Sequence, residues 1–360
     1  MRDLGALREL LSAIAAAVLA VLVLLLGLWL AGFAPSAVVT TAWAGFAGSP
    51  TRLAIWLQEA TPLLFTGLAA GIALRAGVLN IGLEGQYLLG AVAGVAVLTG
   101  DLPQLGLALP LLAAAAGALA GAAWCAGPLL LERTRGVPLV LSTILLNVVA
   151  ALVVGILVQG PLHDATTAAP QSAVVADANR LPALVAGTGL TCAAGLALLL
   201  AFATWLMQRQ TALGFELTAA GLNPTAAGLA GIPVARLQLG AALASGACAG
   251  LAGALQVAGV TFFLAADTHS YGYAGIAVAL LGRLHPLGVI PAALFFAGLD
   301  LGSRQLERRL DIPHDLGDVA KGLAVAIVLV AGAWAARRSG WTGSEKTGSQ
   351  KTGSQNTGAR

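Results

Sequence analysis

Ten long apolar runs follow one another along this chain, and they constrain its fold more than any other feature. Nine have the length that crosses a ~30 Å hydrocarbon core, and they cover residues 10–32, 53–74, 78–99, 104–131, 138–159, 184–207, 238–264, 286–303 and 319–336. The tenth, 270–282, would rise only about 20 Å as a helix, so we expect a short or re-entrant segment buried among other helices. The sequence therefore predicts an all-α polytopic membrane protein with about ten transmembrane helices. Repeated small-xxx-small spacings, such as Gly90/Gly94 and Gly117/Gly121, predict closely packed helices.

Composition excludes several classes of protein. Only 10% of the residues are charged, against about a quarter in soluble domains, and 58% are hydrophobic. The net charge is +3 and the basic residues lie at the ends of apolar runs, so no nucleic-acid partner is expected. The three cysteines and four histidines are scattered without ligand spacing, which predicts no disulfide framework, metal or cofactor and argues against an integral-membrane enzyme.

The arginines favour one orientation. With the N-terminus inside, twice as many fall on the cytoplasmic side as outside, where Arg52, Arg180, Arg304, Arg308 and Arg309 would lie. The positive-inside rule then places both termini in the cytoplasm. Residues 1–340 form the predicted membrane domain, and 341–360 are predicted to be a disordered polar cytoplasmic tail, because their repeated Thr-Gly-Ser pattern buries nothing.

The stretch "GVLNIGLEGQ", residues 77–86, puts Asn80, Glu84 and Gln86 among apolar residues. Counted as helix from Arg75, Glu84 lies about 13 Å deep, and Asn147 is similarly deep in another run. An ionisable group at that depth costs a few kcal/mol and is by default a functional hypothesis. The glycines around it predict a broken helix, which transporters use to build substrate sites. Two interpretations stay open: these side chains line a translocation pathway, or they only bond neighbouring helices.

Three further polar residues are candidates for the pathway on weaker grounds. Gln256, Tyr271 and Tyr273 fall near the outer ends of their runs, where tyrosine is also common for interfacial reasons.

The connection 208–236 is the longest predicted cytoplasmic loop. Asn223 and Pro224 have the arrangement of an N-cap followed by proline at the first helical position, and "TAAGLAG" continues as a short helix that ends near Gly231. So short a helix is marginal alone, which favours an element gripped by another protein over an ordinary loop.

Six blocks in register over about 60–300 carry a family resemblance: "RAGVLNIGLEGQ", "LSTILLN", "GPL…PQS", "AAGLNPTAAGLAGI", "SGACAGLAGALQVAGV" and "GYGYAGIAVALLGRLHPLGV". Together they resemble the permease subunits of ABC importers in the branched-chain amino acid, ribose and nucleoside group, and most closely the nucleoside branch, also called simple-sugar permeases.

The resemblance implies a non-catalytic permease in the bacterial plasma (inner) membrane. Its implied partners are an ATP-binding ABC subunit, a second permease subunit, usually a different chain in the nucleoside branch, and an extracytoplasmic substrate-binding lipoprotein. It also implies that the loop contains the helix that couples to the ATPase, at Gly221, Asn223, Pro224, Ala226, Ala227, Gly228 and Ile232. Thr218 and Leu139 stand where the family often has arginine and an acidic residue.

The leading hypothesis is therefore nucleoside import driven by ATP hydrolysis in partner subunits. A phosphate-binding loop is absent from the sequence because no glycine is followed by lysine. The alternatives are the same machinery importing a simple sugar or a branched-chain amino acid, and a proton-coupled secondary transporter that uses Glu84.

Overall fold

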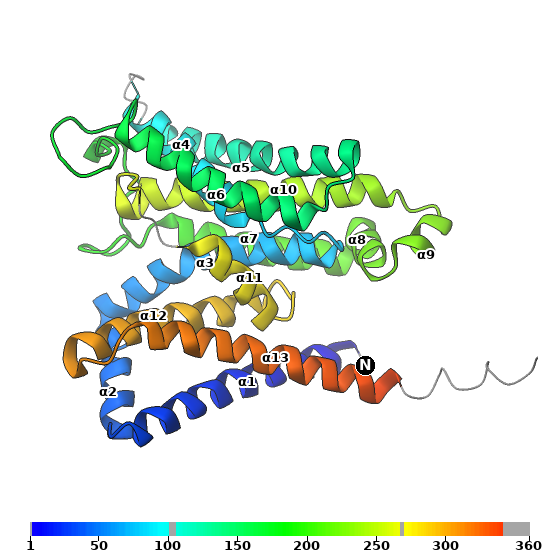
Figure 1. Ribbon diagram of the computed structural model, residues 1–360, viewed down its shortest axis with the longest axis horizontal. Helices are drawn as coiled ribbons and strands as arrows, with labels where there is room; N and C mark the ends of the chain where they lie inside the picture. The colour runs from blue at the N-terminus through cyan, green and yellow to red at the C-terminus, as the bar shows by residue number, and fades with distance from the viewer. Residues whose placement is uncertain (1, 101–105, 267–269, 341–360) are drawn as a thin grey trace, which may run out of the picture.

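The computed structural model describes residues 2–100, 106–266 and 270–340 (Figure 1). Its elements are α1 Arg2–Leu30, α2 Pro35–Phe46, α3 Pro50–Arg75, α4 Leu83–Thr99, α5 Ala108–Arg135, α6 Leu139–Gln159, η1 Asp177–Asn179, α7 Cys192–Gln210, α8 Ala212–Leu222, α9 Pro224–Leu229, α10 Val234–Gln256, η2 Val257–Thr261, α11 Tyr271–Leu281, α12 Val289–Leu310 and α13 Asp315–Gly340. Within these ranges the only β pairing consists of isolated bridges, so the all-α prediction is confirmed. The predicted tail, 341–360, lies outside the described residues.

Five of the described helices are long and apolar enough to cross a membrane: Pro50–Arg75, Ala108–Arg135, Leu139–Gln159, Cys192–Gln210 and Val234–Thr261. Shorter apolar helices include Leu83–Thr99 and Tyr271–Leu281. Leucine, isoleucine and valine side chains on α6 point outward, with Leu152 63% and Ile156 69% exposed. Outward apolar side chains on helices of this length are typical of a protein surrounded by lipid.

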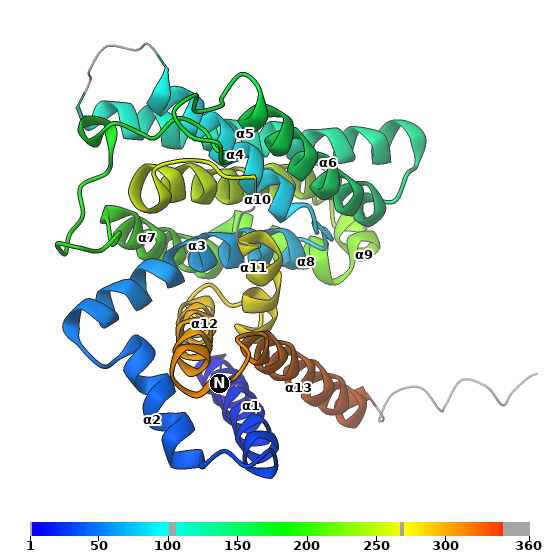
Figure 2. The ribbon, with the colours of Figure 1, turned by 60° about the vertical axis from the view of Figure 1, so that its left-hand side comes forward.

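The helices form three layers, which Figures 1 and 2 show from two sides. One outer layer contains α4, α5, α6 and α10, and the other contains α1, α2, α12 and α13. Between them lie α3, α7 and α11, and α3 contacts α10, α11 and α12. α1 begins and α13 ends at the end of the molecule where α8 and α9 lie, opposite the loop between α6 and α7 (Figure 1).

Glycines let α4, α5 and α10 pack backbone to backbone, as the small-xxx-small spacings predict. A side chain at Gly90 would collide with the backbone of Gly250, and one at Gly121 would collide with the Gly246 carbonyl. Such close approach compensates for the lack of a hydrophobic drive between helices in lipid.

The structure corrects four local expectations. Residues 76–82 break the helix as the glycines predict, so α4 starts at Leu83 rather than at residue 78, and the depth of Glu84 counted along a continuous helix is wrong. The run 184–207 becomes helical only at Cys192, where the Thr191 hydroxyl caps the helix by accepting from Ala193 N. The loop 208–236 holds two helices, α8 and α9, rather than one. The helix α2 was not predicted, because its twelve residues are too few to stand out as a span.

Candidate functional site

Two helix N-termini meet at Glu84. The chain leaves α3 through Gly77, whose φ of +77° suits glycine, and enters α4 with Glu84 in its first turn. There Glu84 Oε2 accepts a 2.8 Å hydrogen bond from the backbone N of Gly272, in the first turn of α11. Gly272 packs so tightly on α4 that a side chain there would collide with the Glu84 backbone. The carboxylate therefore lies where two helix dipoles present their positive ends.

Asn80 and Gln86 pair across the start of α4. Each side-chain amide donates to the carbonyl oxygen of the other at 3.0 Å. Asn80 Oδ1 also accepts from Gly82 N, and Asn80 Nδ2 donates to Ser245 Oγ of α10 at 3.1 Å. Both amides are fully buried, so this pair holds the non-helical turn 76–82 against α4 and α10.

Asn147 joins three helices. From the middle of α6, its Oδ1 accepts from Gly85 N at 2.9 Å, and its Nδ2 donates to Ile81 O at 2.9 Å and to Tyr273 Oη at 3.0 Å. The sequence placed Asn147 and Glu84 at one depth, and the structure brings them to the same junction. Its members, the α4–α11 junction residues, are Asn80, Glu84, Gln86, Asn147 and Tyr273.

The junction is satisfied internally rather than open. Four of its five side chains are buried, and Tyr273 alone among them is substantially exposed, at 43%. Its chemistry is hydrogen bonding of the backbone at two helix starts, which fixes α11 against α4 and α6. A pathway role for these residues stays a prediction.

Tyr271 and Tyr273 line a cavity of about 700 Å³ between α3, α11, α12 and α13. Glu59 Oε2 accepts a 2.8 Å hydrogen bond from Tyr271 Oη, and Asp300 bonds Arg304 and Lys321, each at 2.8 Å. Sequence reasoning missed Glu59, Asp300 and Lys321 as site residues. The sequence could have identified them, because each is a charged residue inside a predicted span, and such residues are candidates for a functional site.

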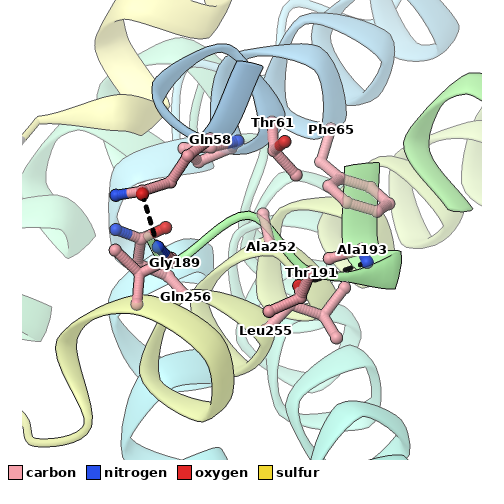
Figure 3. Close-up of a pocket in the computed structure, with 11 residues that line it drawn as sticks. Gln58, Thr61, Phe65, Gly189, Thr191, Ala193, Ala252, Leu255 and Gln256 are labelled. Carbon is pink, nitrogen blue, oxygen red and sulfur yellow. Dashed lines mark hydrogen bonds between the residues drawn. The ribbon is translucent and has the colours of Figure 1, made fainter. Parts of the chain in front are cut away.

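Gln256 lies apart from this cavity. It lines a small pocket between α3, α7 and α10, shown in Figure 3, where Gly189 N donates to Gln58 Oε1 at 2.8 Å. The pocket has room for about 10 Å³, close to the space one water needs. Gln256 therefore does not share a site with Tyr271 and Tyr273.

The helices α8 and α9 form a small bracket at one end of the molecule (Figure 1). Asn223 Oδ1 accepts from Ala226 N at 3.0 Å and Pro224 takes the first helical position, as the sequence predicts. Ala227 is buried against the rest of the chain, while Pro224, Ala226 and Gly228 are exposed. The last residue of each helix projects outward, Leu222 of α8 at 82% and Leu229 of α9 at 88% exposed.

The bracket is joined directly to the turn that leads into α4. A side chain at Gly221 would collide with the Arg75 carbonyl, and Gly77 lies against Gly221. Arg75 Nε donates to Thr218 Oγ1 at 3.3 Å, so the threonine at this position holds α3 to α8. Gln238 of α10 donates to Ala76 O at 3.2 Å.

Comparison with known proteins gives a consistent set of matches. The family described as "Branched-chain amino acid transport system / permease component" matches residues 52–332. A glucose ABC transporter permease protein of Haloferax volcanii is 37% identical, over 76% of this chain and 75% of its own length. A guanosine ABC transporter permease protein of Bacillus subtilis is 33% identical, over 85% and 88% of the two chains. A nucleoside ABC transporter permease protein of Lactococcus lactis is 31% identical, over 71% and 73%. No solved structure matched significantly.

Proposed function

We propose a function from one premise: the chain belongs to the family of permease components of branched-chain amino acid transport systems, as an ABC transporter permease of its sugar and nucleoside group. The permeases of this family are not enzymes. On this premise the chain is the membrane-spanning conduit of an importer and hydrolyses no nucleotide itself. ATP hydrolysis in the partner subunits supplies the free energy for transport.

The observation that carries the proposal is the bracket formed by α8 and α9. It is capped by Asn223, presents the exposed Leu222 and Leu229, and contacts the α3–α4 turn through Gly221. Leu222 and Leu229 are the most exposed of the large apolar side chains that the structure describes, and we take them as the surface on which the ATPase docks. An ATPase that moved α9 would thus pull, through Gly221, on the turn that positions Glu84.

The rest of the assembly follows the family. We propose ten spans in a bacterial plasma membrane with both termini cytoplasmic, a second permease subunit of different sequence, and a substrate-binding lipoprotein outside. The start of α1 and the end of α13 lie at the same end of the molecule as the α8–α9 bracket (Figure 1), which supports this topology because an ATPase docks in the cytoplasm. The α4–α11 junction residues, with Gln256 and Tyr271, are proposed to border the pathway.

The proposed substrate is a nucleoside. The guanosine and nucleoside permeases among the relatives support it. The glucose permease relative, which is also more than 30% identical, supports a simple sugar as the second candidate.

Co-purification tests the proposal. The chain should pull down an ABC ATPase, identified by its own phosphate-binding loop, and Leu229→Asp or Asn223→Leu should abolish this. Leu184→Asp, a matched change at another exposed leucine (65% exposed) in the connection between α6 and α7, should leave it intact. Undiminished binding by well-folded Leu229→Asp and Asn223→Leu chains would overturn the docking assignment.

A further inference from the structure

The cavity of about 700 Å³ between α3, α11, α12 and α13 has a wall that combines ionisable and apolar side chains. Its polar wall comes from Glu59 of α3, Asp300 and Arg304 of α12, and Asp318 and Lys321 of α13. Its apolar wall includes Leu63, Ala274, Ala277 and Phe296. Binding sites for small molecules have volumes of about 300–1,000 Å³ and combine apolar walls with a few fixed polar groups.

Two of these polar groups, Glu59 and Asp300, are half-buried away from the ends of their helices, whereas Asp318 is 72% exposed in the first turn of α13. Glu59 is nine residues into α3, and Asp300 ten residues before the end of α12, so each is about 14–15 Å along its helix from that end. Ionisable groups at such depth are costly, and they are retained where they pair or face a water-filled route. Asp300 does both, because it pairs with Arg304 and Lys321 and lines the cavity. Glu59 lines the cavity and accepts a hydrogen bond from Tyr271.

The wall carries four acidic side chains, three basic ones and His314, and Asp300 is paired with two of the basic groups. Lys321 Nζ bonds both Asp300 Oδ1 and Asp318 Oδ1 at 2.8 Å, and Arg304 bonds Asp300 Oδ2 at 2.8 Å. Farther out, His314 faces Glu307 at 3.2 Å. An ionic solute would therefore compete with the existing ion pairs of Asp300, Arg304, Asp318 and Lys321. No group of three His, Cys, Asp or Glu side chains suited to a metal was found in the described part of the chain.

A neutral solute with several hydroxyl groups fits this wall better. Ionised carboxylates have about four lone-pair sites each, so Glu59 retains acceptor capacity after its 2.8 Å bond from Tyr271. The Asp300–Lys321 pair offers further acceptors and donors fixed in place. The aromatic and alanine side chains opposite would cover the apolar face of a ring.

We propose that this cavity binds an uncharged, polyhydroxylated ring solute, a nucleoside or a sugar, with Glu59 and the Asp300–Lys321 pair holding its hydroxyl groups. The proposal rests on the proposed function and gives it a specific contact site. Tyr271 positions the Glu59 carboxylate by its hydrogen bond, and Tyr273 connects the cavity to Asn147.

Solute protection of an introduced cysteine tests the site without ATP or partner subunits. In the full chain in lipid nanodiscs, with Cys125, Cys192 and Cys248 replaced by alanine, Ala274→Cys places a thiol on the cavity wall. Its labelling by an anionic methanethiosulfonate should be slowed by adenosine or D-glucose, whichever the cavity takes, and not by L-leucine or succinate. Labelling of Ala168→Cys, in the exposed loop between α6 and α7, should be unaffected by all four solutes.

A second variant assigns the effect to the carboxylate. Glu59→Gln should weaken protection about tenfold, because hydrogen bonds to charged groups exceed neutral ones by about that factor. Glu132→Gln, at an exposed position in the last turn of α5 and outside the cavity lining, should not weaken it. Equal labelling with all four solutes, equal protection by leucine, or full protection in Glu59→Gln would overturn the proposal. Protection without ATP-driven uptake in the assembled importer would instead count against the proposed function alone.

Discussion

The Glu84 carboxylate accepts a 2.8 Å hydrogen bond from the backbone N of Gly272, so that the first turn of α4 caps the first turn of α11. These residues are 188 positions apart in the chain. Capping by an acidic side chain at a helix N-terminus satisfies an otherwise unpaired donor and complements the helix dipole. The relationship gives a buried carboxylate a structural role that is compatible with a pathway nearby.

Two replacements of Glu84 distinguish the need for a hydrogen-bond acceptor at this position from the need for a side chain of similar size. Glu84→Gln keeps an oxygen that can accept from Gly272 N, whereas Glu84→Leu leaves a buried N–H unpaired, at a cost of about 1–3 kcal/mol. We expect Glu84→Gln to fold but lower uptake, and Glu84→Leu to lower the melting temperature in detergent as well. Wild-type transport and stability in Glu84→Leu would remove both roles.

Asn147 and Tyr273 should be energetically coupled. Their 3.0 Å hydrogen bond is one of three at Asn147, so Asn147→Ala should destabilise more than Tyr273→Phe. In a double-mutant cycle, contacting residues show interaction energies of about 0.5–3 kcal/mol. The free energies of unfolding of the two single variants and the double variant measure it, and strict additivity would refute the coupling.

Two glycines of α10, one in close contact with α5 and one without neighbours, provide a matched pair of alanine substitutions. A methyl group at Gly250 would collide with the backbone of α5, while one at Gly240 meets nothing within 4 Å. Gly250→Ala should destabilise by about 1–3 kcal/mol through overpacking. Gly240→Ala should be neutral or slightly stabilising, since alanine is the better helix former by about 1 kcal/mol. Equal thermal stability of the two variants would contradict the predicted close contact of α5 and α10.

His314 gives a pH dependence outside the spans. Its hydrogen bond with Glu307, helped by the charges of Glu307 and Asp315, raises the pKa of His314 above its ordinary 6.5. A raised pKa means that the stabilisation is fully present below pH 6.5 and is lost as the pH rises through the folded-state pKa. His314→Gln should therefore reduce the loss of thermal stability between mildly acidic and mildly alkaline pH. An unchanged pH profile would show that the pair does not form.

Apolar runs, helix-capping residues and glycines in the sequence predicted much of this structure. Length and apolarity located most of the long helices but missed α2 and α8. Asn223-Pro224 located the start of α9, because capping is decided by neighbouring residues. The break before α4 followed from its glycines. The end-to-end meeting of α4 and α11 did not follow, because Glu84 and Gly272 meet through tertiary packing that no local pattern encodes. The same limit hid the partnership of Glu59 with Tyr271, although each residue stood out singly.

Uptake into proteoliposomes tests the central claim most directly. The chain reconstituted with its second permease, ATPase and binding protein should accumulate radiolabelled guanosine or D-glucose only when ATP is supplied to the ATPase. The chain reconstituted alone should accumulate neither, with or without a proton gradient. Accumulation by the chain alone under a proton gradient would contradict the account.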